Sequence, residues 1–212
     1  RSMDPYLQNG DDDFAFAIPG LARFRVSAYR QRGSLAAVVR VVSFDIPDWK
    51  EWGIPEAVMG LAEQTSGMIL VTGTAGSGKT TTQACIIDRI NRTRDCHIIT
   101  LEDPIEYIYT SDQCIINQRE VGQDTRSYAD GLKSILREDP DVILIGEMRD
   151  YETISAAVTA AETGHLVLST LHTTSAPQTI ERIVDACPPH GQNQMRMQLA
   201  SVLKGVITQQ LL

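Results

Sequence analysis

A glycine-rich run at residues 73–80 carries the strongest chemical signal in this sequence. Its letters, GTAGSGKT, fit the phosphate-binding pattern G-x-x-x-x-G-K-[ST] at every fixed position. Glycines let backbone N–H groups curl around phosphate oxygens, and a helix that starts there adds positive potential. We therefore expect ATP with Mg²⁺ here, with Lys79 reaching the β- and γ-phosphates and Thr80 ligating the metal. The predicted nucleotide-binding residues are Gly73, Thr74, Ala75, Gly76, Ser77, Gly78, Lys79, Thr80 and Thr81.

Two acidic residues follow short apolar runs that read as strands. Glu147 ends the run DVILIGE, and Glu102 ends the run HIITLE. The carboxyl ends of parallel strands form the edge at which ligands bind, so both acids should reach the phosphate site. We expect Glu102 to act as general base, and Glu147 to hold the Mg²⁺ shell or to activate water. The alternative for Glu147 is a solvent-facing acid, and Asp103 either joins the site or caps the Asp-Pro turn.

His172 follows a further apolar run, at residues 165–171. At a strand end it is a candidate to sense the γ-phosphate or to couple neighbouring subunits, and a structural histidine is the alternative. His165 begins the same run at the opposite edge of the sheet, so a structural role is favoured there, with an interdomain role as the alternative.

A pair of arginines in the N-terminal region forms a separate candidate site. If the hairpin turn centres between Arg32 and Gly33, Arg25 and Arg40 face each other directly. Like charges in that position destabilise a hairpin, and an anion between them would remove the repulsion. The alternative is two solvated or Asp-paired arginines, and a slip of one residue in register would separate them.

The elements that must position these side chains fall into two regions. Residues 13–46 read as strands, with turns expected at Pro19–Gly20 and at Arg32–Gly33, and residues 47–54 read as a linker. From residue 55 onward helices and strands alternate, which indicates a mostly parallel sheet with helices on its faces. The expected helices cover about 55–66, 79–91, 127–137, 151–163, 176–185 and 191–212, and the expected strands 68–72, 97–101, 114–117, 142–145 and 165–171.

Composition excludes several classes of protein. The chain has 212 residues, 42% of them hydrophobic, with 19 Lys+Arg against 27 Asp+Glu for a formal net charge of −8. This is globular composition, and the acidic balance argues against nonspecific nucleic-acid binding. No apolar run is long enough for a transmembrane helix, and no secretory signal opens the chain. The four cysteines form no CxxC pair, so we expect reduced thiols and no cysteine-bound metal. Both ends look cut, since the chain starts at Arg1 and stops within an apolar pattern that reads as helix.

Four motifs, in this order, resemble those of the secretion ATPases of type II and type IV pilus systems. They are GTAGSGKT, LEDPIE, DVILIGEMRD and TAAETGHLVLSTLHTTSA. Within that family the sequence is most similar to the retraction (PilT-type) ATPases of twitching motility, and the segments INQREVGQDT, LKSILREDPD and ERIVDACPP strengthen this resemblance. The resemblance covers about residues 12–212.

The resemblance implies an α/β fold, with a RecA-like P-loop NTPase domain preceded by a partial PAS-like, mainly β domain. The implied boundaries are 1–46, 47–54 for the linker and 55–212. ATP would bind between subunits of a hexameric ring.

By the same resemblance, Glu102 falls in the Asp box, Glu147 in the Walker B box, and His165 and His172 in the His box. Arg25 and Arg40 match arginines that approach the nucleotide's phosphates, which agrees with the hairpin argument. This sequence departs from the usual Walker B form because Gly146 stands between the apolar run and the acid. The absence of the tetracysteine zinc element of the assembly ATPases favours retraction. Against the family pattern, we expect the opening segment of the N-terminal domain and the region after Leu212 to be absent from this sequence.

The expected function is an ATP-hydrolysing motor for pilus retraction, in which nucleotide-driven domain closure makes the stroke. Its catalytic residues would be Glu102, Glu147, His172, Arg25 and Arg40, with Thr80 and Glu147 as metal ligands. Its expected partner is an inner-membrane pilus platform protein, and its location cytoplasmic, peripheral to the inner membrane. The alternatives are a pilus assembly or type II secretion ATPase and a nonhydrolysing, nucleotide-gated assembly module. A nucleic-acid translocase should show a basic stripe or an aromatic stacking platform, and the net charge of −8 and the lack of a Lys/Arg-rich run count against this alternative.

Overall fold

The computed structural model describes residues 4–18, 21–42 and 45–211. The chain forms two compact units, one of residues 1–45 with 106–108 and one of residues 46–105 with 109–212. The domain boundaries expected from the sequence, at residues 46 and 55, are not tested by this division into units and stay a prediction.

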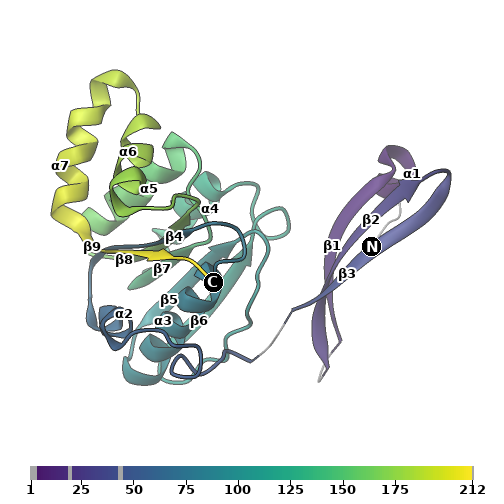
Figure 1. Ribbon diagram of the computed structural model, residues 1–212, viewed down its shortest axis with the longest axis horizontal. Helices are drawn as coiled ribbons and strands as arrows, with labels where there is room; N and C mark the ends of the chain where they lie inside the picture. The colour runs from purple at the N-terminus through teal and green to yellow at the C-terminus, as the bar shows by residue number, and fades with distance from the viewer. Residues whose placement is uncertain (1–3, 19–20, 43–44, 212) are drawn as a thin grey trace. The chain divides into compact units, whose positions relative to one another are not determined.

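The first unit is a small antiparallel sheet with the strand order β1-β2-β3 (Figure 1). Helix α1 (Asp4–Asn9) precedes β1 (Asp11–Ile18), β2 (Ala22–Gln31) and β3 (Ser34–Val42). Arg32 and Gly33 form the two-residue turn between β2 and β3, with positive φ angles of 48° and 78°, a pattern that matches the twist of a hairpin. The expected β-hairpin is confirmed, whereas the expected turn at Pro19–Gly20 lies outside the described residues.

The second unit is built on a six-stranded sheet with the order β6-β5-β7-β8-β4-β9, in which every pair of neighbours is parallel. Parallel strands buried on both faces read as continuous apolar runs, and β4, β7 and β8 are buried throughout. The strands are β4 (Gly67–Gly73), β5 (His97–Glu102), β6 (Ile115–Glu120), β7 (Val142–Ile145), β8 (Leu166–Leu171) and β9 (Leu203–Gln209). The expected RecA-like α/β architecture, preceded by a small β-sheet, is confirmed.

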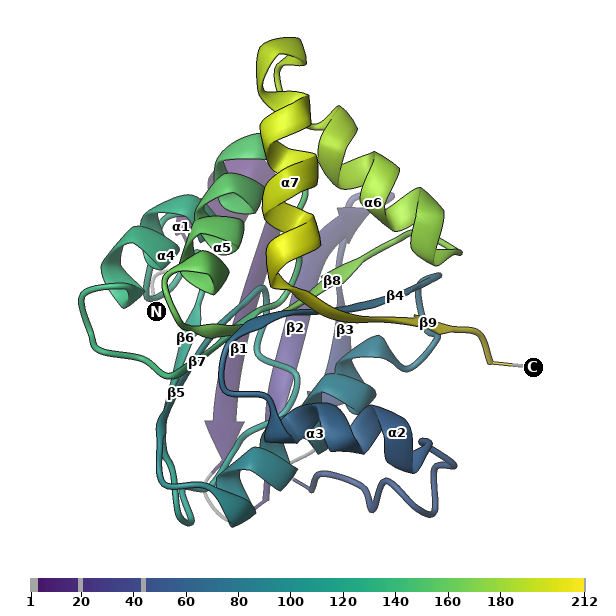
Figure 2. The ribbon, with the colours of Figure 1, turned by 90° about the vertical axis from the view of Figure 1, so that its left-hand side faces the viewer.

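Helices cover both faces of this sheet, as Figure 2 shows. On one face lie α4 (Tyr128–Ile135), α5 (Tyr151–Glu162), α6 (Ala176–Asp185) and α7 (Gln192–Val202), and their apolar sides join one buried core. On the other face α2 (Glu56–Met59), a 3₁₀ turn at Gly60–Glu63 and α3 (Lys79–Thr93) close a second core. The expected helix over 55–66 is therefore two short pieces.

The expected helix over 191–212 is confirmed up to Val202 and wrong after it. The helix α7 ends at Val202, and the chain continues as β9, which pairs in parallel with β4 at the edge of the sheet. The run Val206, Ile207 and Thr208 is β-branched and favours a strand, and Gly205 disfavours a helix interior. As a result β4, which leads into the phosphate loop, has a hydrogen-bonded neighbour on each side.

Candidate active site

The glycine-rich run forms a loop between the end of β4 at Gly73 and the start of α3 at Lys79. Gly76 and Gly78 have φ angles of 77° and 85°, a left-handed conformation that glycine adopts at no steric cost. Residues 74–76 are exposed at the rim of the loop. The loop therefore opens the helix N-terminus to solvent, which is the arrangement that binds phosphate.

Lys79 lies back across this loop. Its side chain is buried, and its ammonium Nζ donates to the carbonyl oxygens of Gly73 (3.0 Å) and Thr74 (2.8 Å). A buried ammonium needs such partners, and phosphate oxygens are stronger ones than neutral carbonyls. The structure thus places the Lys79 cation within the loop that the sequence predicts to bind phosphate.

Gly73 has no room for a side chain. A β-carbon there would lie 2.4 Å from the backbone oxygen of Gln209 on β9 and 2.5 Å from Ser77 Oγ. The first glycine of the motif is therefore required by the close approach of the edge strand and of the loop itself.

Glu102 ends β5, and its carboxylate is buried next to two polar side chains. Thr100 Oγ1 donates to Glu102 Oε1 at 2.7 Å, and Gln118 Nε2 lies 3.4 Å from the same oxygen. Threonine, two residues earlier on the strand, points to the same face as the acid. These contacts hold the carboxylate oxygen in place at the carboxyl edge of the sheet.

Glu147 follows β7 and contacts two basic side chains. Arg149 Nε donates to Glu147 Oε2 at 2.8 Å, and His172 Nε2 lies 3.5 Å from the same oxygen. The glycine before it is held by two neighbours, because Gly146 N donates to the Leu101 oxygen and its oxygen accepts from Thr170 Oγ1. The ends of β5, β7 and β8 are thus linked, and Glu147 and His172 are brought together as the strand order requires.

Tyr128, which the sequence did not point to, lies among the same acids. Its hydroxyl is 2.9 Å from the place where a β-carbon on Gly146 would stand. Burial raises the pKa of this phenol above its ordinary value, and the nearby carboxylates of Glu147, Asp103 and Glu102 raise it further. Tyr128 therefore stays protonated and able to donate a hydrogen bond.

Glu120 is a second buried acid that the sequence did not point to. It ends β6 opposite Glu102, and its carboxylate accepts hydrogen bonds from Ile105 N at 3.1 Å and from Gln123 Nε2. These contacts tie the segment after β5 to the turn after β6. The polar residues that end this strand, IINQRE, gave no motif that would have identified it.

Asp103 and His165 take no part in the hydrogen bonds described above for this cluster of acids. Asp103 is exposed beside Pro104, and its carboxylate makes no hydrogen bond to the part of the chain that the structure describes. His165 stands at the opposite edge of the sheet, with Nδ1 2.9 Å from the Ala160 oxygen at the end of α5. That contact belongs to the helix terminus.

Arg25 and Arg40 belong to the other compact unit. The β2–β3 register pairs their Cα positions directly, as the turn arithmetic predicted. Arg25 is half-buried and Arg40 is exposed, and within residues 4–18, 21–42 and 45–211 neither has an acidic partner. The like charges therefore face each other without a carboxylate between them.

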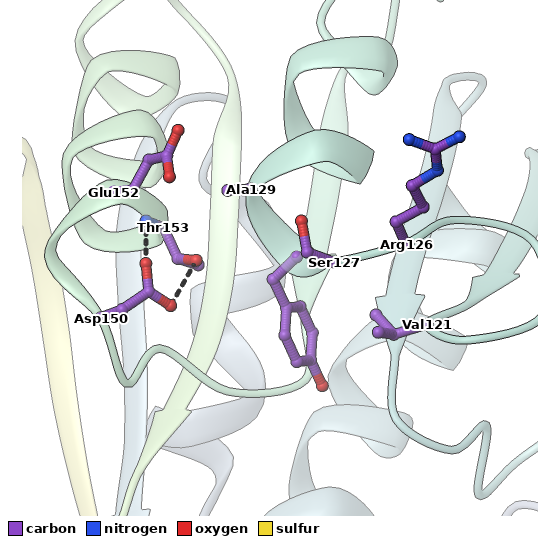
Figure 3. A pocket seen from close by; sticks show the side chains of 8 residues that line it. Val121, Arg126, Ser127, Ala129, Asp150, Glu152 and Thr153 are labelled. Carbon is purple, nitrogen blue, oxygen red and sulfur yellow. Dashed lines mark hydrogen bonds between the residues drawn. The ribbon is translucent and has the colours of Figure 1, made fainter.

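A hollow of about 370 Å³ lies between the starts of α4 and α5 (Figure 3). Asp150 Oδ1 and Oδ2 accept from the backbone N and Oγ1 of Thr153, and Ser127 Oγ accepts from Asp130 N. The two helix starts that line this hollow are thus capped by their own side chains.

The residues expected to hold Mg²⁺ fit that ion chemically. The hydroxyl of Thr80, at the start of α3, and the carboxylate of Glu147 are oxygen donors, which Mg²⁺ prefers together with phosphate oxygens. None of the described helices is long and apolar enough to cross a membrane.

Comparisons with known proteins place this site in a family. A family model described as "Type II/IV secretion system protein" matches residues 11–212. The type IV pilus retraction ATPase PilT of Pseudomonas aeruginosa is 48% identical over the whole chain, and a twitching motility protein of Neisseria gonorrhoeae is 51% identical over 98% of it. The chain spans 61% and 55% of the length of these two relatives.

Solved structures agree with the sequence relatives. A crystal structure of the pilus retraction motor PilT with bound ADP superposes with a TM-score of 0.95 at 53% identity, covering 99% of this chain and 61% of that one. The ATPase DotB of Legionella pneumophila superposes with a TM-score of 0.85 at 30% identity, covering 95% of this chain and 58% of that one.

Proposed function

Because this chain belongs to the family of type II/IV secretion system proteins, we propose that it is the nucleotide-hydrolysing part of a motor that retracts type IV pili. The observation that carries this proposal is the loop between β4 and α3, with the buried Lys79 ammonium at its centre and the acids of β5 and β7 on the same sheet edge. The similarity to a retraction motor with bound ADP supports it.

The residues of the site divide the chemistry of hydrolysis. Residues 73–81 bind the nucleotide, and Lys79 exchanges its loop carbonyls for phosphate oxygens. Thr80 and Glu147 would hold Mg²⁺, which neutralises phosphate charge when bound. Glu102, with its carboxylate held by Thr100, orients and deprotonates the attacking water. His172 contacts Glu147 and reports the state of the γ-phosphate site to its neighbours.

Arg25 and Arg40 supply positive charge to the transferring phosphoryl group. The register of β2 and β3 places the two arginines opposite each other, and neither guanidinium group has a carboxylate partner in the described part of the chain. Both groups are therefore available to bind an anion. An arginine that stabilises this transition state contributes on the order of 10³–10⁵ in turnover.

The next parts of the proposal concern the whole protein and rest on the resemblance of its sequence motifs to the retraction ATPases. The chain works in a hexameric ring, with domains at 1–46 and 55–212 joined by a linker at 47–54. Nucleotide-driven closure of these domains delivers force to a pilus platform protein of the inner membrane, and the motor is cytoplasmic and peripheral to that membrane. A pilus assembly or type II secretion ATPase would use the same chemistry in the opposite or a different transport step.

Steady-state phosphate release from Mg²⁺-ATP at rising protein concentration tests the proposal. Specific activity should rise with concentration, and Glu147→Gln, Arg25→Ala and Arg40→Ala should each abolish it. Glu63→Gln, at an exposed acid outside the site, is the matched control and should keep full activity. ATP binding without turnover in a full-length ring would favour the nonhydrolysing assembly module instead.

A further inference from the structure

Two polar atoms beside the phosphate loop are buried without a hydrogen-bond partner among the residues that the structure describes. They are Ser77 Oγ in the loop and Gln209 Oε1 on the edge strand β9. A buried polar atom that stays unpaired is destabilising, so a state that pairs both atoms would be favoured.

The two atoms are complementary and close to the same residue. The Ser77 hydroxyl is a donor and the Gln209 amide oxygen is an acceptor. Ser77 Oγ lies 2.5 Å from the place of a β-carbon on Gly73, and the backbone oxygen of Gln209 lies 2.4 Å from that place. Gln209 Nε2 is also 3.8 Å from the corresponding place on Gly78. The Gln209 side chain therefore extends along the loop from Gly73 towards the start of α3.

Nucleotide binding would change the hydrogen bonding of Gly73. Its carbonyl oxygen accepts one of the hydrogen bonds of Lys79 Nζ, and phosphate oxygens compete for that ammonium. If Lys79 turned to phosphate, the Gly73 carbonyl would lose this hydrogen bond, which would allow the loop around Ser77 to rearrange. The loop would then be free to bring the Ser77 hydroxyl to the Gln209 amide.

We propose that Gln209 is a positioning residue for the nucleotide, and that Ser77 Oγ donates a hydrogen bond to Gln209 Oε1 when phosphates occupy the loop. This contact ties the loaded loop to β9, a strand that carries none of the residues assigned to hydrolysis. The inference rests on the proposed function, because it needs a nucleotide in the loop.

The test measures ADP affinity by calorimetry with Mg²⁺, and the melting temperature without nucleotide. Gln209→Met keeps the length of the side chain and removes both polar atoms. The dissociation constant for ADP should rise about tenfold, as expected for the loss of one buried hydrogen bond. The melting temperature without nucleotide should stay equal or rise, because an unpaired buried oxygen has been removed. Gln210→Met, at the exposed neighbour, is the control and should change neither value.

Ser77→Ala completes a double-mutant cycle. It should raise the dissociation constant by a similar factor, and the double variant should bind no more weakly than either single variant. If the fold-changes in the dissociation constant multiplied in the double variant, the proposed contact between these two residues would be wrong. Unchanged ADP binding by Gln209→Met, whether or not its melting temperature falls, would overturn the positioning role alone. If the unsubstituted protein binds no ADP, the proposed function fails and the inference fails with it.

Discussion

The hydroxyl of Tyr128 occupies the space next to Gly146, 2.9 Å from where a β-carbon on that glycine would stand. Gly146 is the residue that separates the apolar strand β7 from Glu147, the feature in which this sequence departs from the usual Walker B form. The departure has a steric reason, because the first residue of α4 packs against the backbone at this point.

Gly146→Ala should therefore destabilise the protein by about 1–3 kcal/mol, the usual cost of overpacking. It should also lower ATP turnover, since the displaced Tyr128 lies beside Glu102 and Glu147. Urea unfolding and phosphate release measure the two effects. Adding Tyr128→Phe to this variant removes the hydroxyl and should restore stability. Gly60→Ala, at a helical glycine with open space around it, should be neutral or stabilising.

Glu102 and Glu120 stand opposite each other in register, and their glutamine variants should behave differently. Glu102→Gln should lower kcat by about 10²–10⁴ while ADP affinity is kept, as for a lost general base. Glu120→Gln should mainly lower the free energy of unfolding, because Glu120 accepts hydrogen bonds from Ile105 and Gln123. If both variants were equally stable and lost turnover equally, the assignment of Glu102 as general base and Glu120 as structural acid would be wrong.

The pairing of Arg25 with Arg40 predicts opposite effects on stability and activity. Arg40→Glu places opposite charges across the hairpin and should stabilise it by about 0.2–1 kcal/mol. The same variant should lose turnover by about 10³ or more. Arg40→Gln removes the repulsion without adding attraction, so its stability should fall between the two. If Arg40→Glu kept full activity, the phosphoryl role of this arginine would be wrong.

Two cysteines should resist alkylation at pH 8. Burial is the main cause that raises the pKa of Cys85 to about 11 and that of Cys96 to about 12. The thiolate is the reactive form of cysteine. Because the pKa of Cys85 is about 11 instead of 9.0, the thiolate fraction of Cys85 at pH 8 is about a hundredfold lower than that of an ordinary cysteine. The labelling rate of Cys85 with iodoacetamide should rise with pH until about 11. A rate that levels off near pH 9 would mean that this thiol is exposed in solution.

Local patterns were sufficient to predict several parts of this structure. The phosphate loop was found because its glycines, Lys79 and Thr80 have a fixed spacing. The alternation of strands and helices placed Glu102, Glu147 and His172 on one edge of the sheet. Turn arithmetic gave the pairing of Arg25 with Arg40, because a two-residue turn leaves a single possible register.

The parts that sequence reasoning missed depend on contacts between distant segments. Tyr128 matters because of Gly146, and Gln209 because of Gly73 and Ser77. Neither pair has a fixed spacing that a motif could record. The strand β9 was read as helix because it follows α7 without a break, although the β-branched run at Val206–Thr208 gave a signal for a strand.

The edge strand β9 also determines when the nucleotide site is finished during protein synthesis. Thr72 Oγ1 on β4 donates to Thr208 Oγ1 on β9 at 3.3 Å, and 136 residues separate the two. At about 5–20 residues per second, the ribosome releases β9 on the order of 10 s after β4. Both neighbours of β4 in the sheet are made after it, so its backbone groups stay unpaired on both sides until β8 (Leu166–Leu171) has been made, and on the β9 side until the end. The nascent chain therefore presents its phosphate loop on an open sheet edge, where shielding by a chaperone would matter most.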